Sequence, residues 1–251
     1  MAPLAIDLLC GLGGWTEGLL AEGYDVIGFD IERHEYGDMR YPGTLVIQDV
    51  RTLHGSQFKN SSLIMASPPC QEYSYMAMPW KLAKAKAAAI RADTTGEKLA
   101  ALNRLFNECS RIQKEASFSA GRHIPMVVEN VRGAQPWVGR ARWHFGSFYL
   151  WGDVPALMPI TLGSGKSCQS ASVQEHTKNN GGSWFNIAHN TTSGKGRNPD
   201  GRKNGNDWFG PGADCLLQRR HGSKSSGRKM ASAMIAKIPL TLSRHIGATF
   251  R

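Results

Sequence analysis

A cysteine that follows two prolines, Cys70, stands where a reactive thiol would be useful. The preceding run, Ser62-Leu63-Ile64-Met65-Ala66, is apolar and has the length of a buried strand. Because Pro68 and Pro69 cannot extend a strand within a ladder, the chain must turn there. Cys70 then emerges at the carboxyl end of the strand, where open α/β sheets bind their ligands. The thiol is either a nucleophile or a small buried apolar group, and its polar neighbours (Gln71, Glu72, Ser74) favour the nucleophile.

A second chemical group follows another predicted strand, Pro125-Met126-Val127-Val128, which ends at Glu129. A carboxyl group buried at a strand end is costly unless it has a partner or a proton, so we expect a raised pKa. Glu129 is therefore a candidate general acid, and the alternative is a purely structural hydrogen bond. Arg140 and Arg142 alternate along a predicted extended segment and would face the same side, as catalytic donors or as solvated surface groups.

A glycine-rich turn near the start of the chain suggests a bound nucleotide. The predicted strand Leu4–Leu9 leads into Cys10-Gly11-Leu12-Gly13-Gly14, and a helix (Trp15–Ala21) and a strand (Tyr24–Phe29) follow. Asp30 ends that strand, nineteen residues after Gly11. Glycines allow close approach of a ligand, and the acid can accept hydrogen bonds from ribose hydroxyls. The pattern favours an adenosyl-containing ligand over a simple tight turn.

The remaining predicted elements complete an α/β protein with a doubly wound, mostly parallel sheet. They are strands over Thr44–Asp49 and Trp143–Trp151 and helices over Leu82–Ala92, Glu97–Ala120 and Ile235–Ile246.

Composition narrows the class of protein. The five cysteines lie far apart with no Cys-x-x-Cys pair, which argues against a disulfide framework and a zinc site and for a reducing cytoplasm. We therefore expect no metal. No apolar run has a membrane-spanning length, and a first strand at Leu4 leaves no room for a signal peptide.

Positive charge is concentrated in one segment. The chain has a net charge of +10, and Ser164–Lys229 holds eleven Lys and Arg against four Asp and Glu, or +7 of it. Such a segment indicates a polyanion-binding surface. We predict a small, irregular basic module at 164–227 and a main domain at 1–163 plus 228–251. Within the module, Arg219 and Arg220 are candidates for guanine contacts.

Four motifs, in this order and spacing, resemble those of cytosine-5 DNA methyltransferases. They are Asp7-Leu8-Leu9-Cys10-Gly11-Leu12-Gly13-Gly14, Pro69-Cys70-Gln71 with Ser74, Glu129-Asn130-Val131 and Arg140-Ala141-Arg142. The likeness covers residues 4–151 and about the last twenty. Two departures stand out: Leu9 replaces the usual Phe, and Lys229-Met230-Ala231-Ser232 replaces a Gln-x-Gly-Asn motif.

The resemblance implies a Rossmann-like fold that binds S-adenosylmethionine and releases S-adenosylhomocysteine. Its catalytic residues would be Cys70, Glu129, Arg140 and Arg142. The cofactor would be held by Asp7, Leu9, Gly11, Gly13, Gly14, Asp30, Ile31, Asp49, Val50, Pro69 and Leu105. The substrate would contact Gln71, Ser74, Asn130, Arg219 and Arg220.

The implied chemistry explains these residue types. Carbon 5 of cytosine is a poor nucleophile, and addition of a thiolate at carbon 6 makes it a good one. Glu129 would protonate ring nitrogen 3, and Arg142, supported by Arg140, would hold the exocyclic oxygen. A base then removes the carbon 5 proton and the cysteine leaves. Within a duplex the cytosine must first be flipped out.

Two alternatives stay open. One is an RNA methyltransferase of the tRNA-acting branch, although the Cys-Phe-Thr motif of that branch is not found here. The other is a catalytically silent DNA-binding relative, which the intact catalytic residues disfavour. We expect a cytoplasmic monomer that acts on double-stranded DNA, and an accessory protein for target recognition stays open.

Overall fold

The computed structural model describes residues 2–74, 80–158 and 226–251. Within these residues one seven-stranded sheet has the order β3-β2-β1-β4-β5-β7-β6. The first five of these strands are parallel, β7 is antiparallel to β5, and β6 is antiparallel to β7. The predicted doubly wound, mostly parallel sheet is confirmed. The strands are β1 (Leu4–Leu8), β2 (Asp25–Asp30), β3 (Thr44–Ile47), β4 (Leu63–Ala66), β5 (Met126–Asn130), β6 (Trp143–Phe145) and β7 (Phe148–Gly152).

The strand order reverses between β1 and β4, which is where such sheets open a crevice for ligands. The register places Leu8 level with Phe29 of β2 and Ala66 of β4, and Ala66 level with Val128 of β5. The residues that follow these four positions therefore lie in a row along one edge of the sheet. That edge collects the predicted functional groups.

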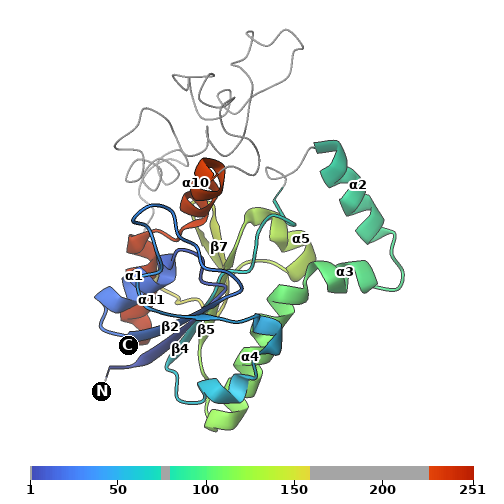
Figure 1. Cartoon of the computed structure of the whole chain (residues 1–251). Coiled ribbons are helices and arrows are strands. Elements are labelled where there is room, and N and C mark those ends of the chain that lie inside the picture. Colours follow the sequence, from blue (N-terminus) through green and yellow to red (C-terminus); the bar gives the residue numbers. More distant parts are fainter. Residues whose placement is uncertain (1, 75–79, 159–225) are drawn as a thin grey trace. The chain divides into compact units, whose positions relative to one another are not determined.

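Helices cover both faces of the sheet. Helices α1 (Gly14–Ala21) and α11 (Leu240–Phe250) lie on one face, and α4 (Arg104–Ala120) lies on the other (Figure 1). Along β4 the side chains alternate between the two: Leu63 and Met65 pack with α1 and α11, and Ile64 and Ala66 pack with α4. All four are fully buried, which explains why the strand reads as an uninterrupted apolar run.

Glycines in α1 allow α11 to approach closely. A β-carbon added to Gly18 would lie 2.1 Å from Ser243 Oγ, and one added to Gly14 would lie 2.4 Å from Ile238 N. Ser243 Oγ donates a hydrogen bond of 2.5 Å to the carbonyl oxygen of Trp15. Glycine in a helix interior is unfavourable by itself, so close packing explains its presence here.

Two predicted elements are interrupted. The helix expected over Glu97–Ala120 is split into α3 (Glu97–Leu102) and α4 at Asn103. The Asn103 side chain accepts a hydrogen bond from the Tyr73 hydroxyl and donates one to the Trp137 carbonyl, so tertiary contacts stabilise the break. The strand expected over Trp143–Trp151 is instead the β6–β7 pair, which turns at Gly146 with φ 57°.

Two predicted boundaries are also wrong. The third strand ends at Ile47 rather than Asp49, whose carboxylate caps the 3-10 turn η1 (Val50–Thr52). The helix expected over Ile235–Ile246 is two helices, because α10 (Ser226–Ala236) ends before Pro239 and α11 begins after it. The residue before a proline avoids the helical conformation, which accounts for the interruption.

The other elements are short or lie beside the sheet. They are α2 (Trp80–Arg91), α5 (Gln135–Val138), η2 (Gly55–Phe58) and η3 (Arg132–Ala134). Among the described residues, no helix combines the length and apolar character needed to cross a membrane. Contacts divide the chain into two units, one of Met1–His34, Arg40–Thr161 and Ile238–Arg251, the other of Glu35–Met39 and Leu162–Lys237. Most of the second unit lies outside the described residues, so the predicted module at 164–227 stays a prediction.

Candidate active site

A residue at the end of β5 stabilises the turn that carries Cys70. Asn130 is fully buried, and its amide group donates a hydrogen bond of 2.9 Å to the carbonyl of Pro68. Its oxygen accepts from the backbone N–H of Val131. Cys70 is half-buried at the carboxyl end of β4, in the place that the prolines predicted. Because the Asn130 amide bonds Pro68 on one side and the backbone of Val131 on the other, its predicted contact with substrate stays a prediction.

The Cys70 thiol is protonated at neutral pH. Burial, and secondarily the negative charge of Glu129, raise its pKa to about 11. A nucleophilic Cys70 must therefore lose its proton when substrate binds. Cys70 follows β4 and Glu129 lies near the end of β5, so the two groups stand at the ends of neighbouring strands.

Glu129 is buried at the end of β5, next to the turn that follows β4. Burial raises its pKa from the ordinary 4.5 to about 8, although a hydrogen bond with the Ser67 side chain opposes the rise. The carboxyl group is therefore mostly neutral at pH 7, as the sequence predicted. A neutral carboxylic acid beside a thiol can donate a proton, which a surface glutamate cannot do at this pH.

The two predicted arginines lie in an irregular segment between α5 and β6. Both are exposed, and the segment is fixed through its backbone: Arg142 N donates to Leu150 O (2.8 Å), and Trp151 Nε1 donates to Gly139 O (2.9 Å). Among the described residues, neither guanidinium has a recorded hydrogen bond or carboxylate partner. Both are free to meet an external group.

The glycine turn between β1 and α1 is open at one glycine and packed at another. Gly11 has φ 52°, and a β-carbon there would meet nothing within 4 Å. Gly13 has φ 74°, and a β-carbon there would lie 2.5 Å from Pro42 Cδ. Leu9 has φ 57°, the one positive value for a non-glycine residue in the described part of the chain. This turn therefore leaves room for a ligand above Gly11.

Asp30 is tied to the glycine turn. Its carboxylate accepts backbone hydrogen bonds from Gly11 (2.8 Å) and Ile31 (2.7 Å). Burial disfavours its charged form, but the nearby His34 and the backbone N–H groups of Gly11 and Glu32 outweigh burial and keep its pKa below the usual value. Asp30 is thus an ionised acceptor at the end of β2.

Asp7, inside β1, is fully buried. Burial raises its pKa to about 8. Its Oδ2 atom accepts a hydrogen bond of 2.7 Å from Thr16 Oγ1, which also bonds the Tyr41 hydroxyl. Its Oδ1 atom has no partner among the described residues. An unsatisfied buried oxygen of this kind is costly unless something donates to it.

The other predicted cofactor residues differ in how available they are. The Asp49 carboxylate binds the Arg51 side chain and backbone, so it is already occupied. Ile31 is 63% exposed, Val50 is buried, and Leu105 packs with Leu9 against the core. Pro69 and Gln71 are exposed and Ser74 is half-buried in the turn around Cys70, whereas Arg219 and Arg220 lie outside the described residues.

A family model described as C-5 cytosine-specific DNA methylase matches residues 4–134, just over half of the chain. The matched range contains the glycine turn, Cys70 and Glu129. The chain belongs to this family.

Several solved structures are similar to this chain. One is described as a DNA modification methyltransferase encoded within an E. coli prophage (24% identity, TM-score 0.34, covering 53% of this chain and 33% of that chain). Another is a mutant of Spodoptera frugiperda DNMT2 (17%, 0.34, 55% and 38%), and a third is the S. pombe Dnmt2 methyltransferase (14%, 0.33, 55% and 37%). The matches span little more than a third of those chains. Similarity at this level gives no information about substrate. No curated protein matches.

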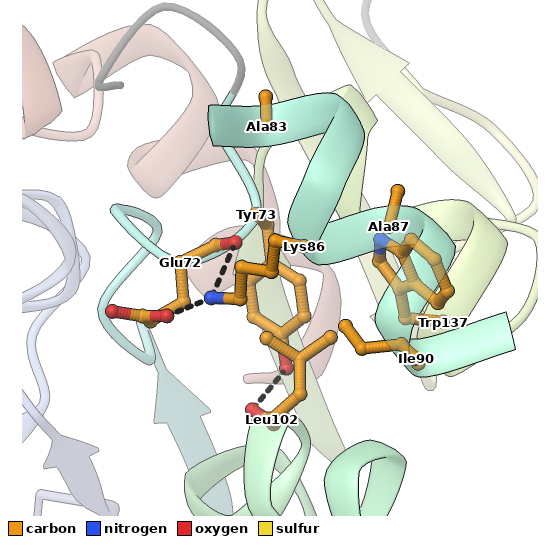
Figure 2. A pocket seen from close by; sticks show the side chains of 8 residues that line it. All are labelled: Glu72, Tyr73, Ala83, Lys86, Ala87, Ile90, Leu102 and Trp137. Carbon is orange, nitrogen blue, oxygen red and sulfur yellow. Dashed lines mark hydrogen bonds and ion pairs between the residues drawn. The ribbon is translucent and has the colours of Figure 1, made fainter. Parts of the chain in front are cut away.

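A pocket beside the Cys70 turn lies between α2 and α3, α5 and the residues that follow β4 (Figure 2). Lys86 of α2 donates to the carbonyl of Glu72 and forms an ion pair with its carboxylate, and the Tyr73 hydroxyl donates to Leu102 O. The pocket is lined by Glu72, Tyr73, Ala83, Lys86, Ala87, Ile90, Leu102 and Trp137. Since its polar groups bind one another or the backbone, the pocket fastens α2 to the turn and shows no sign of a second ligand site.

Sequence reasoning missed several residues that contact the predicted ones. Ser67, which accepts a hydrogen bond from Trp15, stands level with Glu129, and Thr16, which also bonds Tyr41, donates to Asp7. A signal for Ser67 was present, since Ser67 and Glu129 both come directly after the last paired residues of neighbouring strands.

Proposed function

We propose that this methylase transfers a methyl group from S-adenosylmethionine to carbon 5 of cytosine in DNA, through a covalent bond between Cys70 and carbon 6. The observation that carries the proposal is the pairing of a thiol with a neutral carboxylic acid at the sheet edge, beside a glycine turn with room for a ligand. Neither group is typical of a purely structural strand end.

Cys70 and Glu129 assist each other in this mechanism. Proton donation from Glu129 to ring nitrogen 3 makes carbon 6 electrophilic, so that the Cys70 thiolate can add there. Before it donates, the protonated Glu129 places no negative charge beside Cys70, so the thiol loses its proton more readily than it would beside a carboxylate. The exposed Arg142, with Arg140 beside it, supplies donors for the exocyclic oxygen. Removal of the carbon 5 proton then lets Cys70 leave as a thiolate.

The residues around the glycine turn fit a cofactor that carries hydroxyl and cationic groups. Asp30 offers an ionised carboxylate and Asp7 an oxygen without a partner, and the space above Gly11 admits a ligand. When bound, S-adenosylmethionine supplies an electrophilic methyl group. We assign its ribose to Asp30 and Ile31 and its adenine to Val50 and Asp49, which must share its carboxylate with Arg51.

DNA as the substrate rests on the family and on charge. The matching family is defined by DNA methylation, and the excess of positive charge at 164–229 suits phosphates. The cytosine must leave the duplex to reach Cys70, because ring atoms 5 and 6 are stacked inside it.

The test compares methyl transfer from labelled cofactor to duplex DNA and to RNA of the same sequence. We expect the wild type and Cys109→Ala, a buried cysteine of α4, to label DNA, and Cys70→Ala to bind the cofactor without labelling. A duplex containing 5-fluorocytosine should trap the wild type covalently, since fluorine blocks the final elimination. Labelling of RNA alone would move the assignment to an RNA enzyme. Retention of a tenth or more of activity in Cys70→Ala would exclude the covalent mechanism.

A further inference from the structure

Asn103, at the break between α3 and α4, joins two loops that carry predicted catalytic groups. Its side-chain nitrogen donates to the carbonyl of Trp137 at 2.7 Å, and its side-chain oxygen accepts from the Tyr73 hydroxyl at 3.1 Å. Tyr73 comes three residues after Cys70, and Trp137 comes two residues before Gly139–Arg142 (the arginine segment). Asn103 itself is buried. One side chain therefore links the Cys70 turn to the arginine segment.

The neighbours of Asn103 fix the orientation of its amide group. The carbonyl oxygen of Trp137 can only accept, so the amide nitrogen must face it. The amide oxygen then faces Tyr73, whose hydroxyl proton is shared between that oxygen and the carbonyl of Leu102, each at 3.1 Å (Figure 2 draws the second bond). The reverse orientation would set two oxygens against each other at Trp137. The two bonds are therefore compatible with one amide orientation only.

A local role in helix capping does not explain Asn103. It is at the N-cap position of α4, where an asparagine side chain usually accepts from a backbone N–H of the first turn. Here the side chain forms no such bond. The backbone crosses the break by itself, since Asn103 N donates to Leu99 O (3.0 Å) and Asn107 N donates to Asn103 O (2.8 Å). Both polar ends of the side chain are used on other elements.

The first partner, Tyr73, is part of the turn that presents the thiol. The backbone N–H groups of Tyr73 and Ser74 both donate to the carbonyl oxygen of Cys70, at 3.0 and 2.9 Å. The Tyr73 ring is buried, with 4% of the residue exposed. A displacement of this side chain therefore moves the turn around Cys70.

The second partner, Trp137, is part of the short helix that supports the arginine segment. Trp137 lies in α5, next to Gln135 of the same helix. The backbone oxygen of Gln135 accepts from Gly139 N at 3.1 Å, and its side-chain oxygen accepts from Ala141 N at 3.2 Å. A displacement of α5 therefore moves the residues on both sides of Arg140.

We propose that Asn103 is a positioning residue that sets the distance between the Cys70 thiol and the guanidinium groups of Arg140 and Arg142. The thiol adds at carbon 6 while the arginines hold the exocyclic oxygen, so both loops must meet the same base together. A misplacement of about 1 Å can lower a rate by roughly a hundredfold. This inference rests on the proposed function and assigns a role to a residue outside the catalytic set.

The first test measures the two loops and needs no catalysis. It compares full-length protein carrying Asn103→Ala with a matched control, Asn107→Ala, an exposed asparagine one turn further along α4. Alkylation of Cys70 by iodoacetamide reports on its turn, and tryptic cleavage of the folded protein after Arg140 and Arg142 reports on the arginine segment. In Asn103→Ala both rates should rise by about threefold to tenfold, as expected when each loop loses one hydrogen bond. The control should match the wild type.

A second variant separates the two bonds. Tyr73→Phe removes the hydroxyl and leaves the bond from Asn103 to Trp137 in place. It should speed alkylation of Cys70 and leave tryptic cleavage in the arginine segment at the wild-type rate. Rates in Asn103→Ala equal to those of the control would overturn the proposal. If Asn103→Ala does not fold, a wild-type alkylation rate in Tyr73→Phe would overturn it as well.

Methyl transfer then tests the catalytic consequence. Asn103→Ala should lower kcat by about tenfold to a hundredfold and change the KM for cofactor by less than about twofold, since positioning acts on the chemical step. In an Arg142→Ala background the same change should lower kcat by a smaller factor, because a group that Asn103 positions is gone. Equal factors in both backgrounds would overturn the link to the arginine. The loop measurements hold even if the protein methylates no cytosine, so they distinguish failure of this inference from failure of the proposed function.

Discussion

At the scale of single residues, the coupling of Cys70 and Glu129 is the feature with the most direct consequences. The charge of Glu129 raises the pKa of Cys70, so Glu129→Gln should lower it. We expect the variant thiol to react roughly three- to tenfold faster near pH 9, where wild-type Glu129 is ionised. Alkylation by iodoacetamide, read from the Cys70 peptide by mass spectrometry, measures this. The exposed Glu97→Gln serves as control, and equal rates would show that the two groups do not interact.

The same carboxyl group makes stability depend on pH. Its folded-state pKa, about 8, lies above the ordinary 4.5, so the unfolded state loses its proton first as pH rises. The contribution of Glu129 to the free energy of unfolding is therefore fully present below pH 4.5. It falls by roughly 3–5 kcal/mol as the pH rises to about 8. Asp7, with a raised pKa as well, acts in the same direction.

Glu129→Gln cannot ionise, so denaturant unfolding at pH 5 and pH 8 should show a smaller loss of stability than in the wild type. A variant that loses as much stability as the wild type would mean that Glu129 is ionised in the folded protein.

The sequence predicted these ionisable groups well, but it did not predict the residues that form hydrogen bonds around them. The raised pKa of Glu129 follows from a carboxyl group at the end of an apolar strand, which is visible in one short segment. The Trp15–Ser67 bond joins residues 52 positions apart and depends on how α1 packs against the sheet. Arg51 binds the carboxylate of Asp49, two residues before it in the chain. This contact depends on the rotamers of both side chains, which sequence spacing does not predict.

At the scale of elements, the glycines of α1 set the distance to α11. Gly18→Ala should destabilise the protein by about 1–3 kcal/mol, because the new methyl group meets Ser243 Oγ and the backbone nitrogen of Arg244 at 2.1 and 2.5 Å. Gly247→Ala is the matched control. There the nearest atoms, in the side chains of Leu19 and Glu22, lie at 3.2 Å or more, so a shift of a few tenths of an ångström is enough. Thermal unfolding of both variants checks this, and equal effects would contradict the packing argument.

The sequence predicted the elements that hydrophobic periodicity determines. It missed those that depend on a contact between distant residues. The parallel strands were predicted because burial on both faces leaves apolar runs. The break at Asn103 has helix-compatible residues on both sides and exists because its side chain binds Tyr73 and Trp137. The β6–β7 pair was predicted as one strand because its turn, at Gly146, is short and lies between aromatic residues.

At the scale of the whole molecule, the distribution of charge predicts how the proposed binding to DNA depends on salt. Its basic residues between 164 and 227 should bind phosphates, so affinity for a cytosine duplex should fall steeply as salt rises. Binding measured from low to moderate salt checks this. An Arg219→Ala/Arg220→Ala double variant should bind more weakly, with a shallower slope, and should discriminate less between sequences. Affinity that does not change with salt would show that the segment does not carry the interaction.

The contact between α1 and α11 also has a consequence for synthesis. Ser243 bonds to Trp15 across 228 residues, so a ribosome makes the partner of helix α1 long after α1 itself. At about 5–20 residues per second, the glycine face of α1 waits roughly 10–45 s for α11 to be made. Nascent chains that stop before Leu240 should therefore expose Trp15 and Leu19 to chaperones and proteases. The sheet can begin to assemble before that, but one of its faces is covered only once α11 has been made.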